Sequence, residues 1–112
     1  MSQLTLNLVQ GAVSFSFTPE AARHLKAEID QLVQRLKTIA MNASGGSRPK
    51  PQPSLEYRYT GDIFLEIFCN PNIYPSPFAA KVLLTVRDDR IRLTTEAELT
   101  RLIEDLGLYL ES

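Results

Sequence analysis

The feature of this sequence that most constrains its fold is a long run in which apolar residues recur every three or four positions. The run follows Thr18, Pro19 and Glu20, a typical helix start because threonine caps free N–H groups and proline suits the first helical position. It ends near "NASGG", where glycine favours a helix end. The spacing predicts an amphipathic helix from Pro19 to about Asn42. Its apolar stripe consists of Ala22, Leu25, Ile29, Leu32, Leu36, Ile39 and Ala43.

This helix is longer than the strands that it would cover. It would run roughly 36 Å at 1.5 Å per residue, whereas a six-residue strand spans about 20 Å. Part of the stripe is therefore expected to overhang the sheet, and an exposed apolar stripe commonly contacts a partner. The alternative is that sheet twist, the last helix and the linker cover the stripe within the monomer. We predict a homodimer, or docking on another protein, through Leu25, Ile29, Leu32, Leu36 and Ile39.

Three stretches of alternating apolar and polar residues predict three β-hairpins. In the first, a turn at Gln10-Gly11 places every apolar partner on one face of the hairpin. The other two are "LEYRYTGDIFLEIFC", with a three-residue loop from Thr60 to Asp62, and "AAKVLLTVRDDRIRLTT", with a turn at Asp88-Asp89. The expected pairs are Leu8–Val13, Leu6–Phe15 and Leu4–Phe17; Tyr59–Ile63, Tyr57–Leu65 and Leu55–Ile67; Val86–Ile91 and Leu84–Leu93.

The end of the chain, "TTEAELTRLIEDLG", predicts a second helix. Thr95 and Glu98 have the spacing of a capping box. Gly107 is expected to close the helix with Leu108 folding back; the alternative is that the tail "LYLES" continues the helix. The expected buried stripe is Leu99, Leu102, Ile103 and Leu106.

These elements predict an α+β fold in a single domain, residues 1–112. The expected architecture is one mainly antiparallel sheet of about six strands, with two helices packed on one face and the order ββα-ββ-ββα. Residues 43–54, "ASGGSRPKPQPS", combine glycines with spaced prolines and are interpreted as a flexible linker inside this domain.

Two further segments are candidate interaction surfaces. Phe64 and Phe68 fall on the sheet face opposite the apolar set of their strand, where they are either covered or form an exposed aromatic patch. The connection "NPNIYPSP" carries Ile73 and Tyr74 between prolines that fix the backbone. Exposed side chains there would favour a docking loop, and buried ones a structural corner; the corner is preferred.

Composition excludes several chemical classes of site. Cys69 is the only cysteine, so an internal disulfide is impossible, and no Cys/His cluster is present for a metal. The strand phase of Cys69 indicates a buried residue, and the single histidine, His24, lies among basic residues of the helix. The net charge of −1, without a basic stripe, argues against nucleic-acid binding. No signal peptide or membrane span is expected, so the cytoplasm is the default location.

No nucleophile, base and orienting group can be assembled from these residues, so we predict no catalytic residues, no metal and no cofactor. The preferred interpretation is a non-enzymatic protein–protein interaction module: an adaptor, assembly factor or small regulatory subunit. It would act through the long helix, the face bearing Phe64 and Phe68, or the proline-rich loop. The alternative is a small-ligand-binding domain, its ligand unknown, or an accessory subunit of a larger enzyme.

Overall fold

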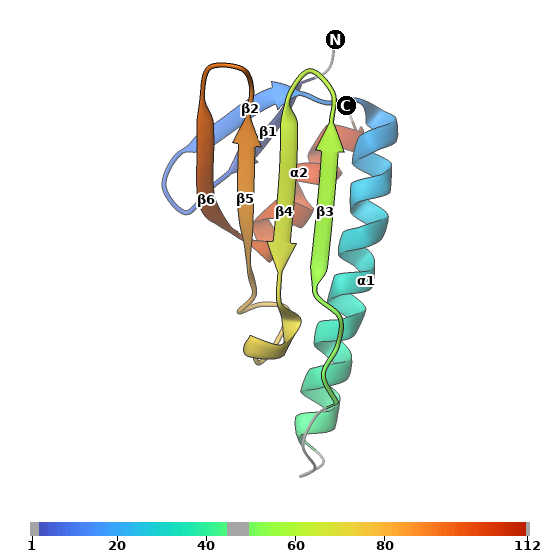
Figure 1. Cartoon of the computed structure of the whole chain (residues 1–112). Helices are drawn as coiled ribbons and strands as arrows, with labels where there is room; N and C mark the ends of the chain where they lie inside the picture. Colours follow the sequence, from blue (N-terminus) through green and yellow to red (C-terminus); the bar gives the residue numbers. More distant parts are fainter. Residues whose placement is uncertain (1–2, 45–49, 112) are drawn as a thin grey trace.

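The computed structural model of the chain describes residues 3–44 and 50–111 and shows an α+β fold with two antiparallel sheets (Figure 1). One sheet has two strands and the other has four, in the order β3-β4-β5-β6. The expectation of a single six-stranded sheet is therefore wrong, and a short 3-10 helix interrupts the expected order of elements. The elements are β1 (Gln3–Asn7), β2 (Ala12–Ser16), α1 (Pro19–Ser44), β3 (Leu55–Thr60), β4 (Phe64–Cys69), η1 (Pro71–Ile73), β5 (Lys81–Arg87), β6 (Arg92–Glu98) and α2 (Leu99–Glu111).

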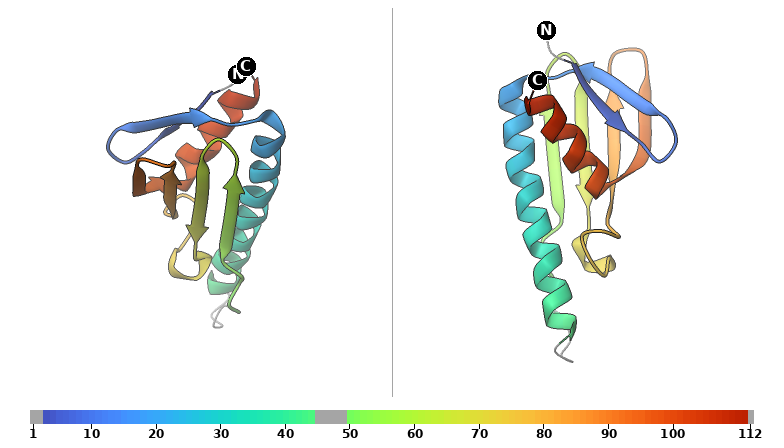
Figure 2. Two further views of the ribbon diagram at one scale, coloured as in Figure 1. Left: turned by 45° about the horizontal axis from the view of Figure 1, so that its top comes forward. Right: turned by 180° about the vertical axis from the view of Figure 1, so that it is seen from behind.

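Three elements cover one face of the four-stranded sheet. From behind, α2 crosses between α1 and the β1–β2 hairpin, and all three lie on the same side of β3 to β6 (Figure 2). The core between these layers combines the apolar face of the hairpin with the inward positions of the strands and helices. Among residues 3–44 and 50–111, no helix or strand lies over the opposite face of the sheet (Figure 1).

Helix α1 begins where the sequence predicts. The Ala21 N–H donates to Thr18 Oγ1 at 3.1 Å, which is the expected N-cap bond. The stripe of α1 is buried from Ala22, at 0 % exposed, to Ile39, at 7 %. The side chain of Ala43 lies outside the described residues.

The lower end of α1 extends beyond the strands, but other segments cover its stripe. The segment leading into β3 runs beside this end of the helix (Figure 1), and Arg35 Nη1 donates to the Pro53 carbonyl at 3.5 Å. Gln52 in turn exchanges two backbone–side-chain hydrogen bonds of 2.8 Å with Asn72. This part of the expected linker is therefore attached to the rest of the fold, while residues 45–49 of the linker lie outside the described residues.

All three hairpins form, but each turn lies one residue from its expected position, so the registers differ by two. Leu4 pairs with Phe15, Tyr57 with Ile67, and Val86 with Leu93. Because strand side chains alternate with a period of two, this shift leaves every residue on its expected face.

Two of these turns show why the positions moved. Val9 and Gln10 are the two central residues of the first turn. Gly11, with φ +93°, follows them in the left-handed conformation and is not itself a central residue. Asp88 stands at the first position of its turn. Its Oδ1 accepts from the N–H groups of Arg90 and Ile91, both at 2.8 Å.

The start and end of α2 also differ from expectation. Strand β6 continues to Glu98, so Thr95 and Glu98 are strand residues and the expected capping box is wrong. The helix continues through Gly107 to Glu111, so Gly107 does not end it. Ile103 is 36 % exposed, whereas Asp105 is 5 % exposed and takes its place in the buried stripe.

Asp105 joins α2 to the first strand. Its carboxylate accepts from the Asn7 backbone N–H at 2.7 Å and from Asn7 Nδ2 at 2.9 Å, with Arg101 Nε 3.7 Å away. A buried carboxylate requires such partners, because burial without them is costly. Nearby, the Tyr109 hydroxyl donates to the carbonyl of Phe17, which directly follows β2, so α2 contacts both β1 and the end of the hairpin through polar groups as well as apolar ones.

We expect Asp105→Ala to lower the free energy of unfolding by about 2 to 4 kcal/mol, because hydrogen bonds to a charged group are lost and the Asn7 amides are left unpaired. Glu104→Ala removes the neighbouring, exposed acid and should change stability by less than about 0.5 kcal/mol. Urea unfolding followed by circular dichroism measures both. Equal losses for the two variants would contradict the role assigned to Asp105.

Candidate functional site

No helix or strand of the described chain covers the outer face of the four-stranded sheet (Figure 1). This face carries both charged and apolar side chains, and its exposed apolar side chains on the two central strands are Phe68 and Leu83. Phe68 on β4 pairs with Leu83 on β5, and these two residues are 40 % and 44 % exposed. In the same cross-strand row, Glu56 and Glu96 occupy the two edge strands. The row therefore places two exposed apolar side chains between two acids.

Ile73 of the η1 segment extends this apolar surface at the end of β4. It is 68 % exposed and lines a hollow of about 190 Å³ together with Phe68, Leu83 and Tyr74. We call Phe68, Ile73 and Leu83 the outer patch. Three exposed apolar side chains around one hollow are more informative than the same residues scattered over the surface.

Phe64, the other aromatic residue expected on this face, is less accessible to a partner than Phe68. It is partly buried, and the Arg87 guanidinium lies 4.4 Å from its ring centroid, a cation–π contact. Beside it, Arg58 Nε and Glu66 Oε2 form an ion pair at 2.8 Å. This end of the outer face is therefore occupied by internal contacts, and the outer patch lies at the other end.

The proline-rich connection after β4 combines features of both expected alternatives. Asn70 Oδ1 accepts from the Asn72 N–H at 3.0 Å, and Pro71 is buried. Tyr74 is partly buried against the core, and burial raises the pKa of its hydroxyl. Ile73 points to solvent. The connection is thus an internally hydrogen-bonded corner that presents one apolar side chain.

The helix residues proposed as an interaction stripe occupy a different environment. Each is 7 % exposed or less, and the monomer itself covers them. They do not form a surface together with the outer patch. The five residues are Leu25, Ile29, Leu32, Leu36 and Ile39.

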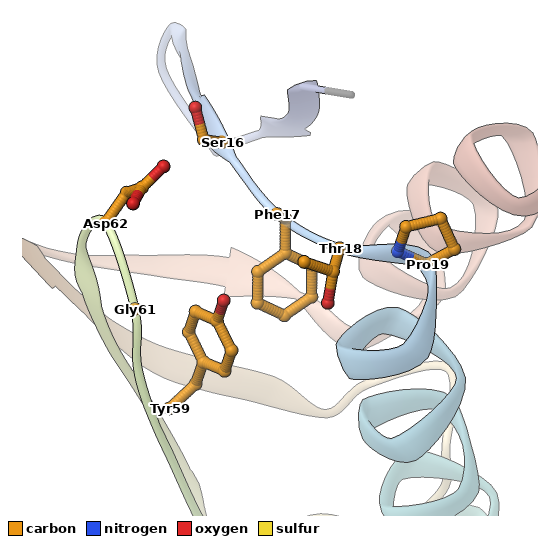
Figure 3. Close-up of a pocket in the computed structure, with 7 residues that line it drawn as sticks. All are labelled: Ser16, Phe17, Thr18, Pro19, Tyr59, Gly61 and Asp62. Carbon is orange, nitrogen blue, oxygen red and sulfur yellow. The ribbon is translucent and has the colours of Figure 1, made fainter. Parts of the chain in front are cut away.

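A cleft of about 360 Å³ lies where the hairpin, the start of α1 and the β3–β4 loop meet (Figure 3). The rings of Phe17 and Tyr59 form its apolar wall, in edge-to-face contact with centroids 4.8 Å apart. Asp62 stands at the end of the loop, across from Ser16. A methyl group on Gly61 would overlap the Tyr59 hydroxyl and ring, so glycine is required for the tyrosine to lie there.

Cys69 and His24 differ in their surroundings. Cys69 is 2 % exposed, and burial raises the pKa of its thiol to about 11. His24 is on the exposed side of α1, where its Nε2 lies 4.0 Å from Glu28 Oε1 and its ring lies near Tyr57. No group of three or more His, Cys, Asp or Glu side chains gathers in residues 3–44 and 50–111. Neither described helix is long and apolar enough to cross a membrane.

Sequence reasoning missed two important positions. Leu83 lies next to Leu84 in an apolar run, and only the strand phase separates the exposed leucine from the buried one. Asp105 is absent from the expected buried stripe of the last helix, and its place between Leu102 and Leu106 is the available signal.

Comparisons of the chain with protein-family models, with curated proteins and with solved structures find no match.

The raised pKa of Cys69 predicts a loss of stability at alkaline pH. A thiol whose folded pKa, about 11, exceeds its ordinary value of 9.0 contributes stability below pH 9 that is lost as the pH rises toward 11. By about pH 10.5 the loss should reach about 2 kcal/mol relative to pH 8. Cys69→Ala lacks this titration, so its free energy of unfolding should fall less over the same range. Parallel pH profiles for the two proteins in urea unfolding would refute the assignment.

Proposed function

We propose that this protein is a non-enzymatic protein–protein interaction module, of the adaptor, assembly-factor or regulatory-subunit kind, that binds its partner through the outer patch. The observation that supports this most directly is the exposure of Phe68, Leu83 and Ile73 around one hollow on an uncovered sheet face. Burial of such side chains is worth about 1.5 to 3 kcal/mol each when complete. Three of them suffice as the centre of a modest interface.

The surroundings of the outer patch indicate the chemistry of the partner. Glu56 and Glu96 lie at the two ends of the Phe68–Leu83 row, on the edge strands. An apolar centre with a polar rim is the usual anatomy of a protein interface. Lys81 also lines the hollow, so the complementary surface is an apolar anchor with Lys or Arg side chains placed toward Glu56 and Glu96 and away from Lys81.

The proposal does not use the α1 stripe. Its leucines and isoleucines already fill the core, so presenting them to a partner would require α1 to separate from the sheet. Phe64, covered by Arg87, and Tyr74, packed against the core, are at most peripheral to the contact.

We expect the double variant Phe68→Ser with Leu83→Ser to lose partner binding while it keeps its fold, because both side chains are exposed. Ile91→Ser is the matched control, since Ile91 is 69 % exposed but lies in the β5–β6 turn away from the outer patch. The measurement is native affinity purification followed by intact-mass analysis of the complex. Recovery of the same stoichiometric partner by all three proteins would contradict binding through the outer patch.

The aromatic cleft favours a second candidate function, the binding of a small ligand. Its volume of about 360 Å³ and its wall of Phe17 and Tyr59 suit an aromatic molecule of modest size. The hydroxyl of Tyr59 and the carboxylate of Asp62 would supply polar contacts at the entrance.

This second candidate predicts that small aromatic fragments bind the protein and raise its melting temperature, because ligands that bind only the native state stabilise it. Gly61→Ala should abolish the effect, since the added methyl group displaces Tyr59. Gly107→Ala is the control, because a methyl group there meets no atom within 4 Å. Thermal shift and ligand-observed NMR provide the readouts. Fragment binding retained by Gly61→Ala would exclude the cleft.

A further inference from the structure

Strand β6 forms an open edge of the four-stranded sheet. It pairs with β5 on one side, and the described chain places no strand on its other side. The opposite edge strand, β3, has α1 beside it (Figure 1). The seven residues of β6 contain neither proline nor glycine, which are common interruptions of an edge strand. Its outward backbone groups are therefore available to another strand.

Charge along β6 is divided by sign. Arg92 begins the strand, directly after Arg90 and Ile91, whereas Glu96 and Glu98 end it. Charges on edge strands often prevent association. That effect requires like charges to meet, so the outcome depends on the direction in which a second strand approaches.

Antiparallel pairing of β6 with the β6 of a second copy brings opposite charges together. Full overlap is centred on Thr95 and places Arg92 opposite Glu98 of the second copy, on the same face of the sheet, with Thr94 opposite Glu96. Opposite charges in such pairs are stabilising and like charges are destabilising. A parallel arrangement in the same overlap would bring like charges together. The charge pattern thus favours a second copy of β6 paired in the antiparallel direction.

Within the monomer, the residue that pairs with Arg92 is a cation and not an acid. This residue is Arg87, whose guanidinium lies over the Phe64 ring. At the other end, Glu98 pairs with Lys81, and no ion pair within 4.0 Å joins them in the described structure. A second copy would supply Arg92 with an acid that the described residues of its own chain do not.

The β1–β2 hairpin supplies an independent observation. Its tip projects past β6 in the views of Figures 1 and 2, and Val9 at the tip is 57 % exposed. Val9 and Gln10 line a hollow of about 330 Å³ together with Lys81, Thr95 and Glu96. A strand added to β6 would lie beside this hollow, and Val9 would cover part of its inner face.

We propose that the protein forms a two-fold symmetric homodimer by antiparallel pairing of β6 with β6, which joins the two sheets into one of eight strands. Phe68, Ile73 and Leu83 take no part in this pairing, and β6 shares only Glu96 with the surroundings of the outer patch, so the proposal stands whether or not the patch binds a partner. The competing possibilities are that a β-strand of another protein pairs with the open edge of β6, or that this edge stays unpaired.

Two charge variants test the proposal. In the first, Arg90→Glu is combined with Arg92→Glu; in the second, Glu96→Lys is combined with Glu98→Lys. Each alone would bring like charges together twice across the symmetry axis, so its dimer dissociation constant should rise by about tenfold or more. An equimolar mixture restores opposite charges and should form a heterodimer. Sedimentation velocity and native mass spectrometry at micromolar concentrations measure all four samples, the unchanged protein included.

Matched controls carry the same changes in charge on helix surfaces: Lys26→Glu with Lys37→Glu, and Glu104→Lys with Glu111→Lys. They should remain dimeric, which separates pairing at β6 from attraction between oppositely charged proteins. Hydrogen exchange of the unchanged protein adds a readout that needs no variant, because amides of residues 92–98 should exchange more slowly as concentration rises. A monomer at high micromolar concentration, charge variants that dimerise normally, or a mixture that stays monomeric would each overturn the proposal.

Discussion

The β1–β2 hairpin has an apolar face that it cannot bury by itself, because an isolated two-stranded sheet is marginally stable in water. Leu4, Leu6 and Phe15 on that face are 5 % exposed or less only because α2 and the four-stranded sheet enclose them. Asp105 makes this attachment specific: its two hydrogen bonds to Asn7 fix β1 against α2 in one position. The first and last elements of the chain therefore depend on each other, and the core closes only when both are in place.

This attachment also decides which surfaces remain open. The hairpin, α2 and α1 all lie on one face of the four-stranded sheet, so nothing is left in the described chain to cover the other face (Figure 2). Helix α1 lies beside β3, whereas the hairpin crosses behind β6 without forming hydrogen bonds to it. The outer patch and the open edge at β6 are thus two consequences of the same arrangement of layers.

The sequence predicted the faces of the elements better than their positions. Burial depends on the alternation of side chains, and a turn displaced by one residue shifts the register by two without moving Leu6 or Val86 to another face. The turns themselves depend on local chemistry, such as the side-chain bonds of Asp88, that a pattern of apolar residues does not contain.

Longer-range contacts explain the other differences. Thr95 to Glu98 match a capping box, but pairing with β5 holds them in a strand. The overhang of α1 follows correctly from its length, yet its cover comes from the segment around Gln52, which Asn72 holds in place. The aromatic residues Phe64 and Phe68 share a face as expected; only the structure shows that Arg87 covers the first and leaves the second open.

The positions of the outer patch and of the β6 edge mean that a dimer would bind a partner more tightly than a monomer would. Leu83 lies on β5, one strand from the edge, so pairing through β6 would separate the two copies of β5 by three strand spacings, about 15 Å. Both outer patches would then lie on the same face of one continuous sheet. A partner with two apolar anchors, or a partner that is itself a dimer, would contact both patches at once. Binding at the second patch would then be intramolecular. The overall affinity would rise although the contacts at each patch stay the same.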